Sequence, residues 1–271
     1  MFAVPRASRA IELFLSLGMI AAAAGASLVT PPEASAQHLH HAEQSQLAQG
    51  GEGGEGGEGG EAGHSVSVQT DLDVLVVLGQ MQGHLLVAQE LLEQQQFSAA
   101  EPHVGHPIDE LYGALEPALK SRRISTFLAT LEELRQQVRL NPQASATAVK
   151  LTRAQQAIAA VAEALPEGGA TNTGTVTAVV RQLAETAVEE YGAAIAGDQV
   201  VEVIEYQDAR GFLLEAQRLL SKAVASQPTA ASQLSAQQQK ITAMLQAFPT
   251  VMPPGKAVMS VARLQQLQKQ L

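Results

Sequence analysis

Three side chains at helical spacing offer the ligands of a metal site. His103, His106 and Glu110 are spaced i, i+3 and i+7, so they share one face of an α-helix over two turns. Two imidazoles and a carboxylate are typical ligands of zinc or non-haem iron, and they leave positions open for further ligands or water. The spacing therefore predicts a site for a zinc or iron ion. The alternative is an ordinary solvated polar face.

His84 is the expected fourth ligand. A first helix is predicted over residues 71–94, and a turn at residues 95–97 joins it to the helix that carries the other two histidines. Counted from this turn, His84 and His106 lie at similar heights on neighbouring antiparallel helices. The alternative for His84 is a buried histidine whose ring is hydrogen-bonded to a nearby carbonyl.

The apolar stripe of the second helix raises a geometric difficulty for this site. If the stripe packs on the first helix, His103, His106 and Glu110 point away from His84. Pro107 offers one solution, because a proline inside a helix disturbs its geometry and frees a carbonyl one turn earlier. A core that wraps both faces of the helix is the other. The stripe consists of Val104, Ile108, Leu111, Leu115 and Leu119.

Carboxylates also gather on both sides of a turn at Gly197. Glu205, Asp208 and Glu215 share one side of the helix that follows this turn, and Glu189 and Glu190 end the helix before it. Carboxylates from two helices of a hairpin can bind a cation. The favoured interpretation is a solvated acidic face, in which Glu215 forms an i, i+3 ion pair with Arg218.

The composition excludes several classes of function. The 271 residues include no Cys and carry a formal net charge of −10. The lack of Cys excludes thiolate nucleophiles, iron–sulfur clusters, Cys-ligated zinc and disulfides. The 17 Lys and Arg are too dispersed to neutralise a phosphate backbone, so we expect no nucleic-acid partner. No HExxH, GxSxG or phosphate-binding glycine loop occurs, and we expect no enzyme.

The N-terminus has the features of a secretory signal peptide over residues 1–36. Arg6 and Arg9 precede a mostly apolar run from residue 13 to 29, and Ala34-Ser35-Ala36 is a small-x-small cleavage signal. The alternative, an uncleaved anchor, would need about 20 apolar residues. The sequence thus predicts a periplasmic or secreted protein that has no membrane span after cleavage.

A low-complexity leader is predicted over residues 37–66. Residues 50–63 hold nine Gly and four Glu, which cannot form a packed core, so this segment is expected to be disordered. Four histidines lie in or beside it. These residues are His38, His40, His41 and His64. They indicate either a plain linker or a tail that binds metal ions weakly.

Residues 67–271 are predicted to form an all-α domain. Apolar residues recur at i, i+3 and i+4, for example in the segment from Ile124 to Val138, and no segment has the period of a strand. We expect an antiparallel helical bundle of seven or eight helices. A glycine-rich break at 165–174 leaves two arrangements open, namely two subdomains or one bundle of two packed helical layers.

Two segments give the chain a family resemblance. The first runs from Gly83-His84-Leu85-Leu86 to Pro107-Ile108-Asp109-Glu110-Leu111-Tyr112, and the second is Glu205-Tyr206-Gln207-Asp208-Ala209-Arg210-Gly211-Phe212. Together they resemble exported helical-bundle proteins of bacteria, imelysin-like or associated with periplasmic iron uptake. The Gly-x-His-x-x-Glu motif of that family is not met, because Gly83 directly precedes His84 and Val87 stands where the Glu is expected. The resemblance implies metal handling and assigns no site residue.

The sequence therefore predicts an exported, non-enzymatic helical bundle that binds a zinc or iron ion as a carrier or sensor in metal homeostasis. The expected ligands are His103, His106, Glu110 and His84, and the expected protein partner is another periplasmic protein. The alternative is a structural or adaptor module without a metal site. In that case a buried polar seam of Asp73, Gln80 and His84 would only fix the packing of the helices.

Overall fold

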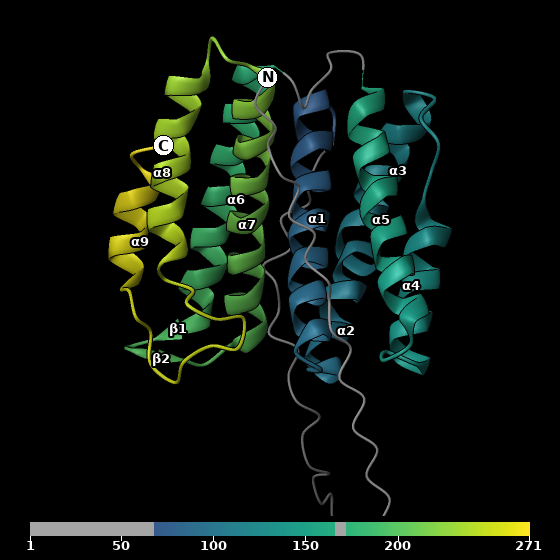
Figure 1. Ribbon diagram of the computed structural model, residues 1–271, viewed down its shortest axis with the longest axis horizontal. Coiled ribbons are helices and arrows are strands. Elements are labelled where there is room, and N and C mark those ends of the chain that lie inside the picture. The colour runs from purple at the N-terminus through teal and green to yellow at the C-terminus, as the bar shows by residue number, and fades with distance from the viewer. Residues whose placement is uncertain (1–67, 166–171) are drawn as a thin grey trace, which may run out of the picture. The chain divides into compact units, whose positions relative to one another are not determined.

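The computed structural model describes residues 68–165 and 172–271, which belong to a single compact unit (Figure 1). The expected signal peptide, the leader with its four histidines and most of the break at 165–174 lie outside the described residues. The helices and strands are α1 (Asp71–Glu93), α2 (Phe97–His106), η1 (Pro107–Leu111), α3 (Tyr112–Ser121), α4 (Leu128–Leu140), α5 (Ser145–Ala164), α6 (Thr173–Ala194), β1 (Ile195–Ala196), β2 (Gln199–Val200), α7 (Val203–Ser226), α8 (Ala231–Leu245) and α9 (Val261–Gln268).

The predicted all-α class and helical bundle are confirmed. Because α2, the π-helical turn η1 and α3 follow one another without a break, the described part of the chain contains eight helical runs. The expectation that no strand occurs is wrong at one place. There β1 and β2 form a short antiparallel hairpin around the predicted turn, where Gly197 has a φ of +64°, a value that glycine adopts without strain. Two-residue strands are too short to show a strand period.

Polar side chains cap the first turn of three helices, α1, α6 and α9. At the start of α1 the Thr70 hydroxyl accepts a hydrogen bond from the Asp73 backbone N–H at 3.1 Å. The Asp73 carboxylate accepts one in return from the Thr70 N–H at 2.7 Å, which completes a capping box. Asn172 caps α6 and Ser260 caps α9 in the simpler way, through one side chain. No helix among the described residues is long and apolar enough to cross a membrane.

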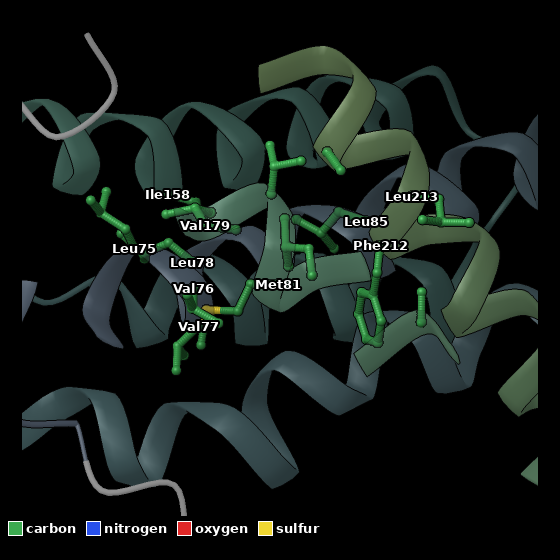
Figure 2. Close-up of a cluster of buried hydrophobic side chains, with 14 of the residues drawn as sticks. Leu75, Val76, Val77, Leu78, Met81, Leu85, Ile158, Val179, Phe212 and Leu213 are labelled. Carbon is green, nitrogen blue, oxygen red and sulfur yellow. The ribbon is translucent and has the colours of Figure 1, made fainter. Parts of the chain in front are cut away.

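Helix α1 is the centre of the fold, because it packs against α2, α5, α6 and α7. It is buried on nearly all sides, as expected for a helix with apolar residues around most of its circumference. Figure 2 shows Leu75, Leu78 and Leu85 of α1 in a cluster of buried side chains that also includes Ile158 of α5 and Phe212 of α7. These contacts join helices from before and after the 165–174 break.

Two glycines allow α1 and α7 to approach closely. A Cβ atom on Gly211 of α7 would lie only 2.5 Å from the carbonyl oxygen of Gly83 of α1. A Cβ atom on Gly83 would lie 2.7 Å from the Phe212 ring. Real Cβ atoms do not approach other atoms this closely, so this crossing requires glycine on both helices.

Candidate metal centre

Three histidines surround one aspartate in the interior of the bundle. The Nδ1 atoms of His84 and His103 lie 2.7 and 2.8 Å from Asp208 Oδ1, and His106 Nδ1 lies 3.3 Å from Asp208 Oδ2. Each of the four side chains has a possible ligand atom within 4.8 Å of those of the others. Imidazole nitrogens and a carboxylate oxygen are typical ligands of a transition-metal ion, so this group could hold one. We call these four side chains the His3Asp cluster.

Three helices position the cluster. His84 lies on α1, His103 and His106 lie on α2, and Asp208 lies in the second turn of α7. The close approach of Gly83 and Gly211 brings α1 and α7 together at this level, since Gly83 precedes His84 and Gly211 lies one turn after Asp208. The cluster thus joins residues that are more than 100 positions apart in the chain.

The packing of α2 removes the difficulty that its apolar stripe raised. Helix α2 packs against α1, α4 and α7, so it is enclosed on more than one side. His103 and Val104, which point in different directions from neighbouring positions, are both fully buried, at 0% and 1% exposure. The chain also departs from α-helical geometry at Pro107, where the π-helical turn η1 begins and where the sequence suggested a kink.

Glu110 lies outside the His3Asp cluster. Its Oε1 atom is 3.6 Å from His106 Nε2, on the side of that ring that faces away from Asp208, and about a third of its side chain is exposed. It occupies the π-helical turn η1 and lies beside His106, four residues earlier in the chain. Of the four predicted ligands, the structure thus brings together His84, His103 and His106, with Asp208 in the place expected for Glu110.

Burial and neighbouring charge set the protonation of the cluster. The side chains of His84, His103 and Asp208 are at most 4% exposed, and that of His106 is 16% exposed. Burial alone would raise the pKa of Asp208, but the charges and hydrogen bonds of the imidazoles hold this pKa well below its ordinary value. Burial lowers the pKa of His84, which Asp208 opposes only in part. These shifts favour an ionised Asp208 and oppose a charged His84.

A buried glutamine connects the cluster to the C-terminal part of the chain through hydrogen bonds. Gln207 Oε1 lies 2.8 Å from His103 Nε2, on the opposite side of the ring from Asp208. The Gln207 Nε2 group donates a hydrogen bond to the backbone carbonyl of Val251 at 3.2 Å. Gln207 is 1% exposed, so both ends of its amide are engaged inside the protein. It links the His3Asp cluster to the loop between α8 and α9.

The acidic residues of α7 are not the solvated face that the sequence favoured. Asp208 and Glu215 are each only 1% exposed. The predicted pair of Glu215 with Arg218 is confirmed, since two hydrogen bonds of 2.6 and 2.7 Å join them. The sequence did show that Asp208 lies on a helix face rich in carboxylates. It did not show that this face meets α1 and α2.

The C-terminal part of the chain is similar to a known family. Residues 166–271 match a family described as an iron permease-associated 4-helix bundle domain. The matched segment contains α6, α7, α8 and α9, and it includes Gln207 and Asp208, whereas the three histidines precede it. The match supports the iron-uptake and helical-bundle parts of the sequence resemblance, and the imelysin-like part stays a prediction. No curated protein and no solved structure matches the chain.

Proposed function

We propose that this chain is an exported protein that binds one metal ion, iron in the cell, at the His3Asp cluster. It would act as a carrier or sensor that serves an iron permease. The observation that carries the proposal is the convergence of three imidazoles and one carboxylate in the interior of the bundle. The similarity of residues 166–271 to an iron permease-associated domain favours iron among the metals that imidazole and carboxylate bind.

The donor atoms need little movement to hold an ion. Ligands of a tetrahedral ion with bonds of about 2.1 Å lie about 3.4 Å from one another. His84 Nδ1 and His103 Nδ1 lie 2.7 and 2.8 Å from Asp208 Oδ1, so they would separate from it by less than about 1 Å. His106, with 16% of its side chain exposed, is the member of the cluster through which an ion would enter from solvent.

A charge balance also favours a cation. Asp208 is a buried carboxylate, and burying an unpaired charge costs several kcal/mol. Arg210 lies nearby in sequence, but its guanidinium pairs with Glu90 at 2.9 Å and donates to the Phe248 carbonyl. A metal ion among the three imidazoles would supply the positive charge that balances Asp208.

Calorimetric titration with Fe²⁺ under anaerobic conditions, and with Zn²⁺, tests the proposal. The leader histidines are first changed to Ala, because they would bind metal on their own. These residues are His38, His40, His41 and His64. We expect one ion per chain with a dissociation constant of about 1 μM or lower. Asp208→Asn, which keeps the side-chain shape, should weaken binding by more than about 100-fold, since loss of an outer hydrogen-bond partner alone costs 10- to 100-fold.

Asp198→Asn is the matched control, because Asp198 is an exposed carboxylate that pairs with Lys256 in the β1–β2 turn. It should bind metal like the parent chain. If the parent chain binds no ion, or if Asp208→Asn binds as well as Asp198→Asn, the proposal is wrong. The His3Asp cluster would then be a hydrogen-bonded contact that fixes the packing of α1, α2 and α7, as in the adaptor alternative.

A further inference from the structure

The hydrogen bonds that run from Val251 through Gln207 to His103 have a fixed direction. A backbone carbonyl only accepts hydrogen bonds, so the Gln207 amide must turn its NH2 group toward Val251, 3.2 Å away. The opposite orientation would place two carbonyl oxygens against each other. The Gln207 oxygen therefore faces His103 Nε2, at 2.8 Å.

This orientation determines where His103 carries its proton. The Gln207 oxygen is an acceptor, so His103 Nε2 must be the N–H donor. A neutral imidazole has one N–H group, which leaves Nδ1 with a bare lone pair. That lone pair points at Asp208 Oδ1, another acceptor, at 2.8 Å. A cation between the two atoms, either a metal ion or a proton, relieves this contact.

We propose that Gln207 is a positioning residue of the metal site, which keeps the proton of His103 on Nε2 and so reserves Nδ1 for the ion. This inference rests on the proposed function. A hydrogen-bond acceptor on the distal nitrogen of a metal-binding histidine fixes its tautomer and ring orientation and raises its basicity. Gln207 would do this for His103, and its bond to Val251 keeps its own amide from turning.

Nitrogen NMR of the metal-free protein tests the tautomer directly. Long-range ¹H–¹⁵N spectra distinguish protonated from bare ring nitrogens, and His103→Ala assigns the signals of His103. We expect His103 Nε2 to be protonated before and after Zn²⁺ is added, and we expect Zn²⁺ to change the Nδ1 signal. A bare Nε2 in the metal-free protein would overturn the inference, whether or not the chain binds metal.

Two substitutions separate the acceptor at His103 from the tether to Val251. Gln207→Leu removes both, and it should weaken Zn²⁺ and Fe²⁺ binding by about 10- to 100-fold. Gln207→Glu loses the amide donor to Val251 but keeps an oxygen acceptor at His103 Nε2, so its affinity should stay within about threefold of the parent chain. The melting temperatures of both variants report the loss of the hydrogen bond to Val251. If Gln207 had a purely structural role, a lower melting temperature would be the only effect of either substitution.

Gln82→Leu is the matched control, because Gln82 is a buried glutamine of α1 whose Nε2 group donates to a backbone carbonyl, that of Gln155, at 2.7 Å. It should leave metal affinity unchanged. If the parent chain binds metal and Asp208→Asn does not, but Gln207→Leu binds like the control, the inference fails while the proposed function stands. If Gln207→Glu binds metal as weakly as Gln207→Leu, then affinity depends on the hydrogen bond to Val251 and not on the acceptor at His103 Nε2, and the inference fails as well.

Discussion

Gly83 of α1 and Gly211 of α7 lie in backbone contact beside the His3Asp cluster. A Cβ atom on Gly211 would lie 2.5 Å from the Gly83 oxygen and 2.9 Å from a methyl carbon of Val87. The contact stands one residue before His84 and one helical turn after Asp208. It therefore brings the two helices close enough for His84 Nδ1 and Asp208 Oδ1 to lie 2.7 Å apart.

Gly211→Ala should force α1 and α7 apart. We expect the free energy of unfolding to fall by about 1–3 kcal/mol, the usual cost of overpacking a core. We also expect metal affinity to fall by about tenfold, because His84 would move away from Asp208.

Gly113→Ala is the control, since a Cβ atom on this α3 residue meets nothing within 4 Å. It should raise stability by up to about 1 kcal/mol. Urea denaturation and calorimetry measure both quantities, and equal behaviour of the two variants would contradict the role of the contact.

Glu110 is expected to matter little for metal binding. Its carboxylate lies 3.6 Å from His106 Nε2, beyond hydrogen-bonding distance, and it is partly exposed. Glu110→Gln should change affinity by less than about threefold. His106→Ala removes a ligand of the cluster and should cost more than about tenfold. A larger loss of metal affinity in Glu110→Gln than in His106→Ala would show that Glu110 is a ligand and that the His3Asp cluster is not the correct set of ligands.

Glu215 is expected to make stability depend on pH. Burial raises its pKa from the ordinary value of 4.5, and its bonds to Arg218 oppose this only in part. The folded state thus holds the proton more tightly than the unfolded state does, so the protein loses stability as the pH rises above about 4.5. Glu215→Gln cannot ionise, so the stability of this variant relative to the parent chain should rise over the same range.

Urea denaturation between about pH 4.5 and 7 measures this difference. Glu132→Gln, which removes an exposed carboxylate of α4, controls for the change in net charge. If the difference in the free energy of unfolding between the parent chain and Glu215→Gln stays constant with pH, as it should for the control, burial does not raise the pKa of Glu215.

Export can be tested at the N-terminus. We expect cleavage between Ala36 and Gln37 when the chain is expressed in a Gram-negative bacterium, so that Gln37 becomes the first residue. Mass spectrometry of the N-terminal peptide from the periplasmic fraction measures this. Ala36→Arg, which removes the small residue at the cleavage position, should leave the chain uncleaved. A full-length parent chain confined to the cytoplasm would contradict the proposed location.

The helices could be predicted because their apolar residues repeat with the helical period. The first helix was expected over residues 71–94 and spans Asp71–Glu93. The predicted stripe between Ile124 and Val138 supplies the buried face of α4 from Leu131 to Val138, whereas Ile124 precedes the helix. The β1–β2 hairpin was missed, because two residues per strand give no period and only the turn at Gly197 is visible in sequence.

The site could be predicted only where its residues are close in sequence. The i, i+3 spacing of His103 and His106 and the short turn to α1 were enough to associate them with His84. Asp208 lies over 100 residues away, and its place depends on how α7 packs against α1 and α2, which no local pattern encodes. Glu110 was chosen on an ideal helical wheel, and it does lie beside His106, but at the ring nitrogen that faces away from Asp208.

The position of the bound ion tests the central claim most directly. Crystals grown anaerobically with Fe²⁺, with data collected on both sides of the iron absorption edge, give an anomalous difference map that locates iron alone. We expect one peak per chain, in contact with Nδ1 of His84, His103 and His106 and with a carboxylate oxygen of Asp208. A map with no peak at the cluster, or with iron bound only elsewhere on the chain, would contradict the account.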